Sequence, residues 1–273
     1  MEHALKTLLI CHHDAPLHRV ALARWLASFS HLTGIVEIRE PRARLWRRVR
    51  RELRRVGLWR FCDVLAYRLW ERLRLSAADR RWEAATLARL ARAYPPEPAG
   101  TPVHVTANPN SAATAAFLRA CAPELALAAC KTILRPDVFT IPARGTYVVH
   151  PGICPEYRNA HGCFWALARD DGRNVGATLL QIDAGVDTGP VYGYFRYPFD
   201  AARESPFVIQ SRVVFDNLDA IGAALLEIGA GRAQPLDTSA RRSAAWGQPQ
   251  LSAYVSWKRR ARSRRAGDYA AVS

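Results

Sequence analysis

Two polar residues, His150 and Asp187, stand where apolar runs of the chain end, and their types suit proton transfer. The run Thr146–Val149 leads into His150, and the run Ala177–Ile182 leads into the loop that holds Asp187. A lone histidine at a strand end is more often structural than catalytic, but functional groups of open parallel sheets gather at the carboxyl ends of strands. A carboxylate near an imidazole orients the ring and favours its protonated form, as general acid–base chemistry requires.

The elements that must position this pair alternate between strands and helices. Strands are predicted at Thr7–Cys11, Ile35–Ile38, Val103–Thr106, Leu125–Cys130, Thr146–Val149, Ala177–Ile182 and, at an edge, Val191–Phe199. Helices are predicted from Pro16 until Gly34 breaks the pattern, at Ser111–Cys121 and at Pro206–Ile228. This order predicts an α/β fold, a mostly parallel twisted sheet of Rossmann-like type with helices on both faces.

Residues 41–94 depart from this order and are predicted to form a helical insertion in an α/β domain of residues 1–232. Nine arginines fall between positions 42 and 60 of the insertion. It either packs on the sheet with a solvated arginine face, or forms a basic amphipathic patch for a membrane surface or another anionic partner. Residues 233–273 form a basic extension, for which docking and partial disorder are both open.

The net charge of +15 does not by itself indicate nucleic-acid binding. Lysine occurs only at Lys6, Lys131 and Lys258, so the excess of arginine is typical of a compositional bias. The basic residues concentrate in the stretches 42–60 and 258–265, which makes the charge regional.

Targeting signals and metal motifs are not apparent in the sequence. No run of uncharged apolar residues is long enough to span a membrane, and no secretory signal is seen, so we expect a cytoplasmic protein, with peripheral membrane association as an alternative. His150, Cys154, His161 and Cys163 lie near one another in sequence. Zinc motifs use tighter, repeated spacings, so no metal is predicted.

Five segments in order resemble the core of the folate-dependent formyltransferases. They are Ile133–Pro142, His150–Arg158, Phe164–Leu167, Val175–Thr178 and Asp183–Gly189. That family includes the methionyl-tRNA, glycinamide ribonucleotide and nucleotide-sugar formyltransferases. The resemblance is good over roughly residues 100–200 and looser over the opening strand, helix and strand.

The resemblance implies roles for individual residues. His150 matches the catalytic histidine and Asp187 the catalytic aspartate. The implied cofactor is 10-formyltetrahydrofolate, whose pterin ring would meet the backbone of Ile133 and Leu134. The remaining implied folate contacts are in the loop that carries Asp183, Gly185 and Val186, and we assign Arg158 and His161 to substrate binding.

One departure from the family pattern Asn-x-His affects the implied chemistry. The asparagine position is Val148, which strand alternation places on the same face as His150 without a hydrogen-bond donor. Loss of one oxyanion donor costs about 3–4 kcal/mol, or about 10²–10³ in rate. Asn159, on the neighbouring loop, either supplies the missing amide or is an ordinary turn residue, and His161 is a second candidate donor.

The leading hypothesis is formyl transfer from 10-formyltetrahydrofolate to a primary amine of a small molecule or sugar derivative. A tRNA acceptor is disfavoured, since the stretch after Gly231 is too short for the β-barrel domain that the resemblance associates with that substrate. Two alternatives stay open. One is a catalytically impaired binding module at a membrane or anionic partner, and the other is a 10-formyltetrahydrofolate hydrolase. The sequence does not indicate an oligomeric state.

Overall fold

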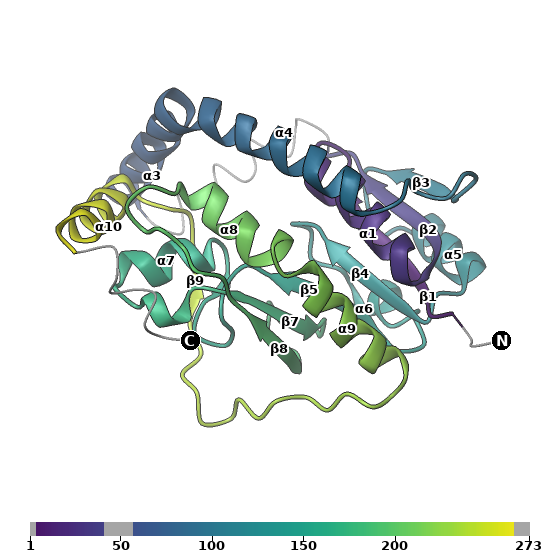
Figure 1. The fold of residues 1–273 in the computed structure, drawn as a ribbon. Helices are drawn as coiled ribbons and strands as arrows, with labels where there is room; N and C mark the ends of the chain where they lie inside the picture. Colours follow the sequence, from purple (N-terminus) through teal and green to yellow (C-terminus); the bar gives the residue numbers. More distant parts are fainter. Residues whose placement is uncertain (1–3, 41–56, 265–273) are drawn as a thin grey trace.

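The computed structural model describes residues 4–40 and 57–264, which form a seven-stranded sheet with helices on both faces (Figure 1). The strands are β1 (Lys6–His12), β2 (His31–Ile38), β3 (Val103–Thr106), β4 (Leu125–Ala129), β5 (Thr146–His150), β7 (Ala177–Gln181) and β8 (Val191–Phe195). Their order across the sheet is β3-β2-β1-β4-β5-β7-β8. The strands from β3 to β5 run parallel to their neighbours, and β7 is antiparallel to both β5 and β8. The predicted mostly parallel fold is confirmed.

The helices cover the sheet because its central strands are apolar on both faces. In β1, Leu9 joins the core cluster that contains η1 (Leu17–Ala21), α1 (Leu22–Phe29), α8 (Pro206–Phe215) and α9 (Leu218–Gly229). Leu8 and Ile10 point to the other face and pack with α5 (Ala112–Cys121) and α6 (Pro136–Phe139). The alternation along one strand thus divides the interior into two layers.

Gly34 does not break the chain between a helix and a strand, as predicted, but lies inside β2. A Cβ at this position would lie 2.7 Å from the Cys121 sulfur and 3.1 Å from the Phe117 ring. The glycine is therefore explained by the close approach of α5 to the strand.

The predicted helix 206–228 is wrong in one respect, because it is broken into α8 and α9 at Asp216 and Asn217. The Asn217 side chain donates to the Val213 carbonyl (3.0 Å), and the Trp25 indole donates to the Leu218 carbonyl (3.0 Å). The edge strand β8 also ends at Phe195, short of the predicted Phe199.

The described part of the 41–94 segment is helical and consists of α3 (Leu58–Trp70), the π-helical turn η2 (Glu71–Leu75) and α4 (Ser76–Ala93). The part of the predicted insertion from 41 to 56 lies outside the described residues. Helix α4 is tied to α1, since the Arg24 guanidinium donates to the carbonyls of Ala91 and Tyr94 at its last turn. Cations are favoured at that end of a helix.

The described part of the tail is docked on the domain. Helix α10 (Leu251–Ser263) buries Tyr254 and Trp257 and lies beside α3 and α7 (Gly162–Ala168). The Lys258 ammonium donates to the carbonyls of Ala201, Ala202 and Glu204. Within the described residues, no helix has the length and apolar character needed to cross a membrane.

Candidate active site

His150 and Asp187 are brought together, but not for the predicted reason that both lie at carboxyl ends of parallel strands. Strand β7 runs antiparallel to β5, so His150 pairs with Thr178 at the start of β7 and Tyr147 pairs with Gln181 at its end. The loop after β7 therefore starts at the opposite edge and returns to His150. There the Asp187 Oδ2 lies 3.5 Å from the His150 Nδ1.

The returning loop is held by polar contacts at both ends. The Arg158 guanidinium donates to the Val186 carbonyl (2.7 Å), and the Asn159 backbone N–H donates to the Asp187 carboxylate (2.8 Å). Asp183 accepts from the Gly185 N–H (2.9 Å) and from the Thr188 hydroxyl. The predicted folate loop thus has internal hydrogen bonds around Asp183, and near Asp187 it is hydrogen-bonded to the segment after β5.

The imidazole of His150 has an assignable protonation pattern. Its Nε2 lies 2.8 Å from the Tyr157 carbonyl, which can only accept, so Nε2 carries a hydrogen. The Nδ1 that faces Asp187 then carries a lone pair when the ring is neutral, and it carries a hydrogen when the ring is an imidazolium. Because a Cβ on Gly152 would lie 2.7 Å from Nε2, glycine at 152 leaves room for the ring. The buried His150 can take up and return a proton at Nδ1.

Val148 lies in an apolar cluster with Cys154, Leu180, Val191 and Tyr194. Its side chain offers no donor. On this face of β5, position 148 therefore lacks the side-chain amide that the Asn-x-His pattern places next to the histidine.

The two candidate replacement donors have other partners. The Asn159 amide nitrogen donates to the Trp246 carbonyl (2.5 Å), and its backbone has the left-handed φ of +77°. His161 is partly buried, and burial together with the nearby cations Lys131 and Arg68 lowers its pKa to about 4. It bonds to Gln248 and Gln210 and is neutral at pH 7. These geometries do not favour either side chain as an oxyanion donor.

The predicted pterin segment is held by side chains that sequence reasoning did not single out. Asn110 donates to the Ile133 carbonyl (2.9 Å) and accepts from the Arg135 N–H (2.8 Å). His12, buried at the end of β1, accepts from the Lys131 N–H (3.0 Å). The signal for His12 was available, because it is a polar residue that ends an apolar strand. Leu134 is buried and Ile133 is exposed.

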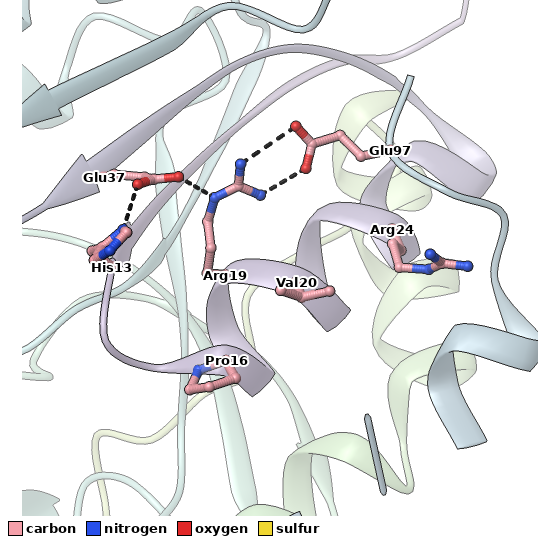
Figure 2. A pocket seen from close by; sticks show the side chains of 7 residues that line it. All are labelled: His13, Pro16, Arg19, Val20, Arg24, Glu37 and Glu97. Carbon is pink, nitrogen blue, oxygen red and sulfur yellow. Dashed lines mark hydrogen bonds and ion pairs between the residues drawn. The ribbon is translucent and has the colours of Figure 1, made fainter. Parts of the chain in front are cut away.

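A second imidazole–carboxylate pair lies at the carboxyl ends of β1 and β2 (Figure 2). The His13 Nδ1 is 2.8 Å from the Glu37 carboxylate, which also accepts from the Arg19 guanidinium. Arg19 pairs with Glu97 as well (2.6 Å). These residues line an open cavity of about 400 Å³. Burial raises the pKa of Glu37, but the hydrogen bonds from Arg19 and His13 outweigh burial and hold that pKa below its usual value.

The described side chains form no group that could hold a metal, and three buried cysteines stay in the thiol form. Within residues 4–40 and 57–264, no three histidine, cysteine, aspartate or glutamate side chains are grouped to hold a metal. Burial raises the pKa of Cys11, Cys154 and Cys163 to about 12, so these thiols stay protonated.

Comparison with known proteins supports a family assignment. A family profile described as "Formyl transferase" matches residues 80–223, which is more than half of the chain. The methionyl-tRNA formyltransferase of Microcystis aeruginosa is 33% identical over 122 residues, 44% of this chain and 33% of that protein. The chain thus matches only about a third of the length of such relatives.

Solved structures of low sequence identity share the fold. A 4-N formyltransferase from Francisella tularensis matches with a TM-score of 0.54 at 10% identity, covering 95% of this chain and 88% of that one. Glycinamide ribonucleotide transformylase 1 from Symbiobacterium toebii matches with a TM-score of 0.54 at 14% identity, covering 87% and 96%.

Proposed function

The chain belongs to the formyl transferase family, and we propose that it transfers the formyl group of 10-formyltetrahydrofolate to a primary amine of a small molecule or sugar derivative. The observation that carries the proposal is the His150–Asp187 pair. One ring nitrogen is fixed by the Tyr157 carbonyl, and the other lies 3.5 Å from the carboxylate.

His150 and Asp187 suit the proton transfers that the reaction requires. The folate supplies a formyl group on nitrogen, which passes to the amine while a proton passes the other way. The His150 Nδ1 accepts the proton of the attacking amine, and Asp187 stabilises the imidazolium that results. The same N–H would then return the proton to the departing nitrogen, and the positive charge of the ring would stabilise negative charge on the formyl oxygen.

The residues at the predicted cofactor site fit a flat apolar ring with polar edges. Ile133 and Val186 expose apolar side chains on the segment after β4 and on the loop after β7. The backbone between Lys131 and Arg135 is pinned by His12 and Asn110, so its remaining groups keep fixed directions. Such preorganised backbone groups suit recognition of a pterin edge.

The cavity at His13 and Glu37 supports a small acceptor. Its volume of about 400 Å³ lies within the usual range of small-molecule sites, about 300–1,000 Å³. It opens at the carboxyl ends of β1 and β2, on the edge of the sheet where β5 ends in His150. Polar groups from His13, Arg19 and Glu97 could bind hydroxyl or amine groups of a sugar-like acceptor.

Calorimetric titration of the full chain with a stable 10-formyltetrahydrofolate analogue tests the cofactor site. We expect micromolar binding that the His150→Ala variant keeps. Formyl transfer to a panel of amino sugars and small amines, followed by mass spectrometry, then tests the reaction.

Three results would separate the hypotheses. Binding with transfer that His150→Ala removes supports the proposal. Binding with release of formate alone indicates the hydrolase, and binding without reaction indicates the impaired module. Absence of binding at millimolar analogue would contradict all folate-based functions.

A further inference from the structure

Helix α3 lies beside α10 at one end of the molecule (Figure 1), and α3 with the turn η2 carries a stripe of exposed apolar side chains. The exposed apolar side chains of this stripe are Leu58, Trp59, Leu65, Leu69, Trp70 and Leu73. Trp59 is 88% exposed and Leu73 is 70% exposed. The opposite side of the helix buries Val64 and Tyr67, and within the stripe Trp70 is partly covered by its contact with the buried Tyr254 of α10 (ring centroids 6.5 Å apart).

The exposed charged side chains beside the stripe include two arginines. Arg72 and Arg74 are exposed beside it, and the Arg74 guanidinium lies 5.3 Å from the centre of the Trp70 ring. The two acidic residues of α3 and η2 are engaged elsewhere. Asp63 accepts from the Ser252 backbone of α10 (3.0 Å), and Glu71 lies beside Tyr67.

Helix α10 extends the basic surface. It is joined to α3 through Ser252 and Asp63, and it lines an open groove of about 540 Å³ with that aspartate. Val255 and Arg259 line the same groove and are exposed. The end of the molecule therefore combines apolar side chains with arginines from two helices.

We propose that this surface, the apolar stripe of α3 and η2 with its flanking arginines, docks on an anionic lipid bilayer. A basic amphipathic helix lies in the plane of the interface, with its apolar side chains below the headgroups and its cations at the phosphates. Tryptophan is enriched at this depth. An apolar patch on the order of several hundred Å² marks an interaction site on a soluble domain.

The charge pattern favours a bilayer over a second copy of the chain. In a symmetric contact the stripe meets itself, which brings the arginines of one copy against those of the other. Such like-charge contacts disfavour association, whereas anionic headgroups complement the arginines. The proposal concerns the described residues 57–75 and 251–263. Of the arginine-rich stretch 42–60 that the sequence offered for this role, 42–56 lies outside the described residues.

Sedimentation of the full chain with phospholipid vesicles tests the proposal. Vesicles of phosphatidylcholine and phosphatidylglycerol in equal parts are compared with vesicles of phosphatidylcholine alone. We expect the protein to bind the anionic vesicles and to be released as salt concentration rises. The double variant Trp59→Ser/Leu69→Ser should bind about a hundredfold more weakly, because each burial of a large apolar side chain contributes about tenfold.

Two further variants make the result specific. Arg72→Gln/Arg74→Gln should weaken binding to anionic vesicles and reduce its salt dependence. Leu226→Ser/Leu236→Ser removes exposed apolar side chains elsewhere on the surface and should bind like the wild type. Circular dichroism checks that all variants are folded.

The proposal is overturned if the stripe variant binds as well as the wild type, or if neutral vesicles bind equally. Light scattering after gel filtration gives a third contrary result. A wild-type dimer that Trp59→Ser/Leu69→Ser converts to a monomer, without vesicle binding, would identify the stripe as an interface between copies.

Discussion

The sheet carries two imidazole–carboxylate pairs at one edge, and they differ in how the ring is enclosed. His150 is 5% exposed, with one nitrogen bonded to the Tyr157 carbonyl and the other near Asp187. His13 has a side chain that is 49% exposed, and its Nδ1 lies 2.8 Å from the Glu37 carboxylate and 3.5 Å from the Arg39 guanidinium. The first ring has both nitrogens directed by protein atoms, while the second ring is about half exposed to solvent.

This difference indicates different tasks. A ring whose tautomer is fixed and whose cation has a carboxylate beside it suits proton transfer at a defined place. An exposed ring held by a glutamate that is itself paired with Arg19 suits recognition, because an imidazole within reach of a ligand can donate or accept a hydrogen bond. The two pairs can be separated by substitution.

The largest expected effect comes from His150→Ala, set against His13→Ala. Removal of the general acid–base at 150 should lower kcat by about 10²–10⁴, with the affinity for the folate analogue nearly unchanged. Loss of His13 should instead raise KM for the amine and leave kcat within a few-fold. Steady-state kinetics of both variants gives the comparison.

Both variants replace a histidine with alanine, so each is the control for the other. Equal losses of kcat in both would show that the pairs act together in the chemical step. An unchanged kcat in His150→Ala would remove His150 from the mechanism.

A smaller effect, in the opposite direction, is expected from Val148→Asn. An amide next to His150 on the same face of β5 should stabilise the developing negative charge and raise kcat by about 10- to 100-fold, less than the full value of a preorganised donor. The apolar neighbours Cys154 and Leu180 limit the gain, since they do not orient the amide. Kinetics and thermal melting are measured on the same samples.

Val148→Leu is the matched control, because it keeps the position apolar and should give no gain. If Val148→Asn folds and transfers no faster than the wild type, position 148 is not where the oxyanion forms. The site would then differ from the family pattern by more than one residue.

The sequence indicated the strands and the family. The hydrophobic pattern of a short segment did not predict the direction of a strand or its register with its neighbours. An apolar run such as Ala177–Ile182 looks the same in either direction, so the reversal of β7, and the return of its loop to His150, could not be predicted. His13 meets Glu37 through the register that pairs Cys11 with Glu37 in β1 and β2, which depends on tertiary structure. By contrast, His12 could have been singled out as a polar end to a buried strand.

The smallest expected effect tests the electrostatics of the second pair through Glu37→Gln. Hydrogen bonds from Arg19 and His13 keep the pKa of Glu37 below its ordinary 4.5, although burial acts in the other direction. The carboxylate therefore stabilises the folded state above pH 4.5, and this stability is lost as pH falls through the lower pKa of the folded protein. Thermal melts should show wild type more stable than Glu37→Gln by about 1–2 kcal/mol at pH 7, with the difference vanishing in acid.

Glu227→Gln supplies the comparison that makes this result interpretable. Glu227 also pairs with an arginine, Arg232, but on the surface, where solvent screens the interaction. Its melting curve should follow the wild type at every pH. If Glu37→Gln melts like Glu227→Gln, the network at the His13 cavity contributes nothing to folding. Its charges would then serve only a ligand, which would strengthen the assignment of this cavity to the acceptor.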